Sequence, residues 1–209
     1  MALDDLLDEH EQSERVQDWL RRNGAGLIGG VVLGLAAIGG WQWWQREQDA
    51  RQLAAADRYQ QAVDSIEADA AAGADQVAGL QPGTFQVLAS LQLAAAQVEA
   101  GQADAAITTL RAIRSDDPAM QDVIARRLAR LMIDTGEPAQ ALELLASADS
   151  PAALEIRGDA QLALGKPELA REAYTQALAG MDVASPQRGI LELKLTDAGG
   201  SVDRTEAQS

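Results

Sequence analysis

One pattern occurs three times in the sequence, as Gly101-Gln-Ala-Asp-Ala-Ala106, Gly136-Glu-Pro-Ala-Gln-Ala141 and Gly165-Lys-Pro-Glu-Leu-Ala170. In each copy a glycine is followed five positions later by an alanine, and the copies are 35 and 29 residues apart. Glycine ends a helix well because it adopts the left-handed conformation of a C-cap. Proline suits the first turn of the next helix, and alanine allows two antiparallel helices to pack closely. The pattern therefore predicts three helical hairpins.

The stretches on either side of each copy have apolar residues at helical spacing. They predict helix pairs at residues 88–100 with 103–113, 123–135 with 138–146, and 151–164 with 167–178. This spacing resembles the tetratricopeptide repeat (TPR), a helix-turn-helix unit of about 34 residues. The last unit matches best, with Gly158, Ala170, Tyr174 and Ala177 at repeat positions. The usual aromatic residues of the first helix are replaced by Ser90, Ala125 and Leu154.

Stacked hairpins bury a continuous core only if both ends are covered. Residues 54–66 and 188–195 have helical apolar spacing and are the expected covers. Between the first cover and the hairpins, residues 71–83 contain three glycines and Pro82, which predict a loop, and Thr84 is placed to cap the next helix. From residue 197 onward the chain is rich in Gly, Ser and charge, which predicts a disordered tail.

A long apolar segment precedes this domain. No charged residue occurs from Asn23 to Gln45, and residues 24–44 are apolar except for Gln42. A helix of this length spans about 30 Å, the thickness of a bilayer core. A cleaved signal peptide is disfavoured because the first 22 residues carry seven acidic side chains. We expect an acidic tail at 1–22, a transmembrane helix at 23–45, a linking helix and loop at 46–83, a TPR-like domain at 84–196 and a disordered tail at 197–209.

Tryptophans mark both ends of the segment, since indole rings prefer the membrane interface. They are Trp19 at one end and Trp41, Trp43 and Trp44 at the other. The Arg21 and Arg22 pair gives only a slight preference for a cytoplasmic N-terminus.

Within the segment Gly26, Gly30 and Gly34 recur every four residues and form a flat ridge where a partner helix could pack. Glycine is also common in transmembrane helices for no such reason, and both interpretations stay open.

Composition restricts the classes of function. The 209 residues include 17 Lys and Arg against 32 Asp and Glu, for a net charge of -15. Such a chain lacks the basic surface that nucleic acid binding requires. There is no cysteine, and the only histidine, His10, lies in the acidic tail. Carboxylate pairs such as Asp116 with Asp117, or Glu168 with Glu172, are interpreted as helix caps or solvated surface. We expect no enzyme activity, no cofactor and no metal.

One cluster of basic residues is a candidate binding site. Arg126 and Arg130 are four residues apart on one predicted helix, and the TPR alignment places them on the concave surface. Two guanidinium groups in an acidic domain could bind a peptide carboxylate. The alternative is a surface pair neutralised by Asp122 and Asp134, and this alternative is favoured because ion pairs on exposed helices are common.

The residues around the apolar segment, together with the hairpins, resemble one family. Trp19, Asn23-Gly24, Leu27-Ile28, Gly30, Val31, Gly34, Gly40-Trp41 and Trp44 are similar to the YfgM family of Gram-negative bacteria. The resemblance implies a single-pass inner-membrane protein in contact with membrane lipid, with a cytoplasmic N-terminus and a periplasmic domain. It further implies a non-enzymatic accessory subunit of the SecYEG translocon that pairs with the chaperone PpiD and helps transfer exported unfolded proteins to periplasmic chaperones.

Two other classes remain open at the level of the sequence. A tethered TPR scaffold for envelope or cell-division machinery has the same layout. A hydrolase with an unusual carboxylate site would require a deep pocket with buried paired acids.

Overall fold

The structure, a computed structural model, describes residues 4–201, with side chains from residue 16 onward. Within this range it contains nine α-helices and no strand. His10 and residues 202–209 of the expected disordered tail lie outside the described side chains. The chain divides into two compact units, Met1–Ala54 and Ala55–Ser209. An all-α fold with an N-terminal apolar helix is confirmed for the described residues.

The first helix, α1, runs without a break over Asp4–Ala68. It begins within the acidic tail at 1–22, includes the whole apolar segment and ends within the second unit. The prediction that the helix continues beyond the apolar segment is therefore confirmed. A stretch of α1 is long and apolar enough to cross a membrane, and none of that stretch is buried. Its exposed leucine, isoleucine and valine side chains would be unfavourable in water and suit lipid.

The predicted loop at 71–83 is wrong for most of its length, because a second helix, α2, occupies Ala70–Ala78. The carboxylate of Asp69 caps it by accepting a hydrogen bond from the Ala71 amide at 2.9 Å. Gly73 lies inside the helix, where a Cβ would come within 2.5 Å of Ile66 Cγ1. Gly73 therefore allows close packing of α2 against α1, and it does not mark the loop that the glycine content predicts.

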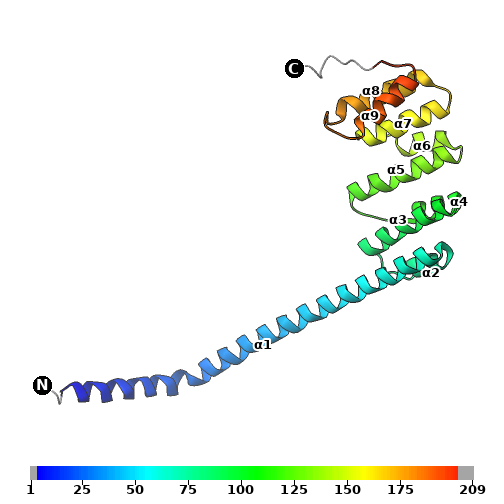
Figure 1. Cartoon of the computed structure of the whole chain (residues 1–209). Coiled ribbons are helices and arrows are strands. Elements are labelled where there is room, and N and C mark those ends of the chain that lie inside the picture. The colour runs from blue at the N-terminus through cyan, green and yellow to red at the C-terminus, as the bar shows by residue number, and fades with distance from the viewer. Residues whose placement is uncertain (1–3, 202–209) are drawn as a thin grey trace. The chain divides into compact units, whose positions relative to one another are not determined.

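The three predicted hairpins are present and follow one another along the domain (Figure 1). They are α3 (Thr84–Glu99) with α4 (Ala103–Ala112), α5 (Pro118–Asp134) with α6 (Pro138–Leu144), and α7 (Pro151–Ala163) with α8 (Pro167–Gly180). Gly101, Gly136 and Gly165 have φ angles of 73°, 84° and 70°, as the C-cap interpretation requires. Pro138 and Pro167 occupy the first turns of α6 and α8, also as predicted.

Two helices begin earlier than their apolar spacing indicates. Helix α5 begins at Pro118, because Asp117 caps it through the Ala119 amide at 3.0 Å. Helix α3 begins at Thr84 itself, and Gly83 is the N-cap with no side-chain hydrogen bond. The prediction that Thr84 caps this helix is therefore wrong.

The core of the second unit consists of three clusters. The largest fills the first two hairpins and reaches α7, and its fully buried members include Ala106, Ala129 and Ala153. The second cluster joins α1 to α2 and α3 through Ala62, Ile66 and Leu93, which confirms that the end of α1 covers the domain. The third joins α8 to the last helix, α9 (Arg188–Asp197), which is the cover expected at 188–195.

The packed structure extends slightly beyond the predicted start of the tail. Asp197 is helical, Ala198 is buried at 4% exposure, and the Gly200 amide donates to the Leu195 carbonyl at 2.9 Å. The Arg171 guanidinium also donates to the Ala198 carbonyl at 2.8 Å. These bonds close the C-terminal end of α9, so order continues past residue 197.

Candidate partner-binding sites

The apolar segment of α1 has two different sides. Gly26, Gly30 and Gly34 lie along one side, and a Cβ added at any of them would meet no atom within 4 Å. At about 100° per residue, Ala37, Trp41 and Trp44 continue this side of the helix. Four exposed aliphatic residues, Ile28, Val31, Val32 and Leu35, lie on the opposite side, and the exposed Leu27 and Leu33 lie at the two edges of the glycine side. The three glycines therefore form a narrow flat strip, bordered by Leu27 and Leu33, where a partner helix could approach closely.

Aromatic residues border the flat side. The Trp41 and Trp44 rings lie 5.4 Å apart in a tilted arrangement one helical turn from each other. At the other end the Asn23 side-chain amide donates to the Trp19 carbonyl at 3.1 Å. A partner helix that packed on the glycines would thus be bordered by indoles at both ends, at the depth where indoles are stable.

Of the two arginines that could bind a carboxylate, Arg126 is already paired within the described part of the domain and Arg130 is not. The Arg126 Nε donates to Asp122 Oδ2 at 2.8 Å, and both side chains are partly buried. Asp122 also accepts a weaker bond from the Ser150 hydroxyl at 3.5 Å, which connects α5 to the start of α7. Neutralisation of Arg126 by Asp122 is therefore confirmed. Arg130 is exposed and forms no ion pair among residues 16–201, including with Asp134.

A polar cluster between α7, α8 and α9 was not predicted from the sequence. The Tyr174 hydroxyl donates to Asp159 Oδ1 at 2.7 Å. The Lys194 ammonium donates to Asp159 Oδ2 and to Glu155 Oε1, both at 2.7 Å. Glu155 and Asp159 are four residues apart on α7, which is a visible signal, but Lys194 is 39 and 35 residues away from them along the chain.

The protonation of this cluster follows from its surroundings. Burial, followed by the hydrogen bond to Asp159, raises the pKa of Tyr174 well above its usual value of 10.0. Burial alone would lower the pKa of Lys194. Its hydrogen bonds to Asp159 and Glu155 outweigh that effect and hold the pKa of Lys194 above its usual value of 10.5. At neutral pH the cluster is a charged clasp between α9 and α7.

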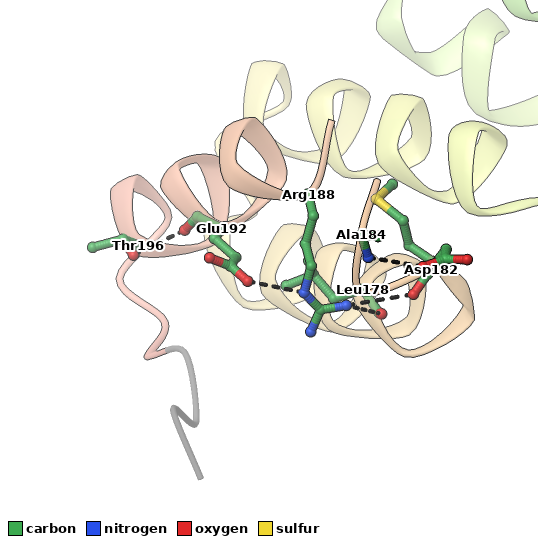
Figure 2. A network of polar contacts seen from close by, with 7 residues as sticks. Leu178, Asp182, Ala184, Arg188, Glu192 and Thr196 are labelled. Atoms are coloured by element: carbon green, nitrogen blue, oxygen red, sulfur yellow. Dashed lines mark hydrogen bonds and ion pairs between the residues drawn. The ribbon is translucent and has the colours of Figure 1, made fainter. Parts of the chain in front are cut away.

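A second clasp fixes the loop between α8 and α9 (Figure 2). The Arg188 Nη1 donates to the Leu178 carbonyl at 3.1 Å and to the Met181 carbonyl at 3.4 Å. Its Nε donates to Glu192 Oε1 at 3.1 Å. A guanidinium at the end of a helix satisfies carbonyls that have no partner within the helix, so Arg188 stabilises the C-terminus of α8.

The acidic pairs considered as catalytic candidates lie on the surface. Asp116 and Asp117 are exposed at the edge of a hollow of about 450 Å³ between the starts of α3 and α5. Glu168 and Glu172 are exposed on α8, and Glu168 pairs with Arg171 at 3.3 Å. These exposed pairs do not have the burial that acid-base catalysis would require.

An exposed apolar helix followed by stacked hairpins defines a membrane-anchored protein with a TPR-like domain. A family model described as a tetratricopeptide repeat-like domain matches residues 17–200. The protein named ancillary SecYEG translocon subunit in Escherichia coli (strain K12) is 30% identical, over 90% of this chain and 96% of that protein. The chain belongs to this family of ancillary SecYEG translocon subunits, the YfgM family.

Two further relatives carry the same name. They come from Aggregatibacter actinomycetemcomitans, at 29% identity, and Haemophilus influenzae, at 26% identity, and each match covers 82% of this chain and 89% of the relative. No solved structure is similar enough to the chain to count as a match. The family resemblance inferred from the residues around the span is confirmed.

Proposed function

We propose that this protein is a non-enzymatic accessory subunit of the SecYEG translocon, which pairs with PpiD and helps transfer exported unfolded proteins to periplasmic chaperones. Membership in a family whose relatives are named ancillary SecYEG translocon subunits carries the translocon part of the proposal. The flat, open side of α1 supports it physically, because helices associate in lipid through close packing at small residues. The exposed helix surfaces of the domain support a role in binding polypeptides.

The proposal includes an orientation, with the N-terminus in the cytosol and the TPR-like domain in the periplasm of the inner membrane. Arg21 and Arg22 next to the span support a cytoplasmic N-terminus only slightly. In spheroplasts, added protease should therefore remove the domain and leave the N-terminal segment intact. The protein should also stay in the membrane pellet after an alkaline carbonate wash. Protection of the domain, or release by carbonate, would contradict this topology.

We further propose that binding is divided between two surfaces. The glycine side of α1, at Gly26, Gly30 and Gly34, would contact the translocon or PpiD within the membrane. The exposed Arg130, with Arg126 released from Asp122, would hold carboxylates of extended client segments through charge-assisted bonds that salt weakens.

The membrane surface can be tested by photo-cross-linking in intact membranes. Replacing Gly26, Gly30 and Gly34 together with Leu should reduce translocon and PpiD adducts while the protein still inserts. A matched control replaces Ile28, Val31 and Val32 with Leu on the opposite side, where the side-chain volume changes little. Undiminished adducts from the triple glycine variant would exclude this side as the contact surface.

The arginine surface needs a control for charge. Arg126→Glu with Arg130→Glu should weaken client cross-linking and leave translocon adducts unchanged. Arg111→Glu with Arg114→Glu changes the net charge equally, at two exposed sites on and just after α4. If both double variants reduce client adducts equally, general repulsion explains the effect and the arginine surface has no specific role.

A further inference from the structure

Helix α9 is apolar on two sides. Leu191 and Leu195 face inward and are almost fully buried against α8. Ile190 and Leu193 face outward, with 59% and 61% of their surfaces exposed. The terminal helix of a solenoid normally has a polar outer side, because no further repeat packs against it.

The opposite end of the same domain follows that rule. The last turns of α1 bury Ala62, Val63 and Ile66 and expose no large apolar residue, since the exposed side chains are those of Gln60, Gln61, Asp64, Glu67 and Ala68. One end of the solenoid is thus closed by a polar surface, and the other presents an apolar one.

The position of α9 indicates the kind of element that would cover it. Helix α9 packs on α8 as α5 packs on α4 and as α7 packs on α6. It therefore takes the place of the first helix of a further repeat. In a longer solenoid a helix would pack against its outer side. The geometry therefore favours a helix as the occupant.

The charges around this surface indicate the composition of that helix. Both basic residues of α9 point away from it: Arg188 binds α8 and Glu192, and Lys194 binds Asp159 and Glu155 (Figure 2 shows the Arg188 contacts). Asp197 follows Leu193 by four residues on the same side and is exposed. It forms no ion pair among the described residues. The carbonyls at the end of the helix are bonded by the Gly200 amide and by Arg171, so Asp197 is the exposed charge that a partner would meet there.

We propose that the outer side of α9, formed by Ile190, Leu193 and Asp197, is a docking surface for a basic amphipathic helix of a partner protein. Apolar residues of that helix, one turn apart, would cover Ile190 and Leu193, and a Lys or Arg would pair with Asp197. A second copy of α9 does not provide this match, because its own basic residues are engaged with α7, α8 and Glu192. The proposal is independent of the translocon assignment.

The test uses the full chain in nanodiscs of zwitterionic lipid and a fluorescent, designed 16-residue helical peptide with a leucine stripe and flanking lysines. Ile190→Ser with Leu193→Ser should weaken binding of this peptide by about tenfold, measured by anisotropy. The matched control, Leu144→Ser with Leu169→Ser, alters two leucines that are 39% and 43% exposed elsewhere and should bind like the native chain. Circular dichroism checks that the variants are folded.

A charge exchange separates docking from general attraction to an acidic protein. Asp197→Lys should weaken binding of the lysine peptide and strengthen binding of the same peptide with glutamates in place of the lysines. Equal binding by the native chain and the double serine variant, or equal loss in the leucine control, would overturn the proposal. It would also be overturned if the native chain forms dimers that the double serine variant abolishes, since a second copy would then be the occupant.

Discussion

Glycine has opposite surroundings in two helices of this protein. Gly158 in α7 is buried against the Tyr174 ring of α8, so that a Cβ would lie 2.5 Å from Cδ1 and 2.9 Å from Cζ. Gly26, Gly30 and Gly34 in α1 have no atom within 4 Å of the same position. In α7 the space left by the missing side chain is filled by the chain itself. In α1 the space beside each glycine of the apolar segment is empty, so it is available to a partner helix.

The largest effect that tests this comparison is expected at Gly158. Gly158→Ala should destabilise the domain by about 3 kcal/mol, because the new Cβ would overlap the fully buried Tyr174 ring, which its bond to Asp159 holds in place. For a chain of this size that lowers the melting temperature by roughly 10 °C, measured by circular dichroism of the full protein in detergent. Gly189→Ala is the matched control, since that helical glycine of α9 has no atom within 4 Å, and it should raise stability by up to about 1 kcal/mol. If neither change lowers the melting temperature, the Tyr174 ring does not fill the space beside Gly158.

Overpacking of the first two hairpins should have the next largest effect. Ala106→Trp and Ala141→Trp place a large ring at positions that are 0% and 1% exposed. Each should lower the melting temperature by several degrees, since overpacking costs about 1–3 kcal/mol. Ala139→Trp, at an exposed position of α6, is the control and should change it little. Unchanged melting of both core variants would mean that these alanines do not pack between helices.

A smaller effect is expected from the polar groups that surround the filled site. The pKa values of Tyr174 and Lys194 are both raised in the folded protein. Below about pH 10 both groups are protonated in the folded and unfolded chain, and their contribution to stability is fully present. Above that pH the unfolded chain releases protons that the folded chain retains, so the free energy of unfolding should fall as pH rises. In the variant with Tyr174→Phe and Lys194→Met this decrease between about pH 10 and 12 should be shallower, as followed by urea denaturation at each pH. An identical slope would show that the clasp is not formed in solution.

The smallest effect is expected for the open glycines. Replacing Gly26, Gly30 and Gly34 with Ala should leave the melting temperature of the domain unchanged, because a Cβ meets nothing there and none of the three belongs to a core cluster. A decrease comparable to that of Gly158→Ala would mean that the chain itself occupies the flat side of α1. The comparison between filled and open glycines would then fail.

The hairpins could be predicted because their signals are local. Gly101, Gly136 and Gly165 each end a helix by a conformation that other residues adopt poorly, and the apolar spacing around them extends over whole helices. Helix α2 was missed because Gly73 was interpreted as a turn residue, whereas it allows close contact with Ile66. A glycine needed for packing and a glycine needed for a turn look alike in one sequence.

The candidate sites divide in the same manner. The glycine side of α1 follows from a four-residue spacing and is visible in the sequence. For Arg126, the four-residue spacing permits an ion pair with Asp122 but does not require one. Only the side-chain geometry shows that the pair forms. The Lys194 clasp could not be predicted, because its partners on α7 are brought to it by the packing of α9 against α8.

The helices of the domain mostly contact their neighbours in the chain, as in the series from α3 to α9. In such a one-dimensional arrangement, order can be lost from an end while the middle stays intact, so amide hydrogen exchange should form a gradient along the domain. Helix α9 packs mainly on one neighbour, α8, and from this packing alone we would expect it to open first. Three side-chain bonds that join α9 to α7 and α8 oppose this, from Arg171 to Ala198, from Arg188 to Leu178 and from Lys194 to Asp159. The terminal helix should therefore exchange together with α8, as one cooperative unit of three helices with α7.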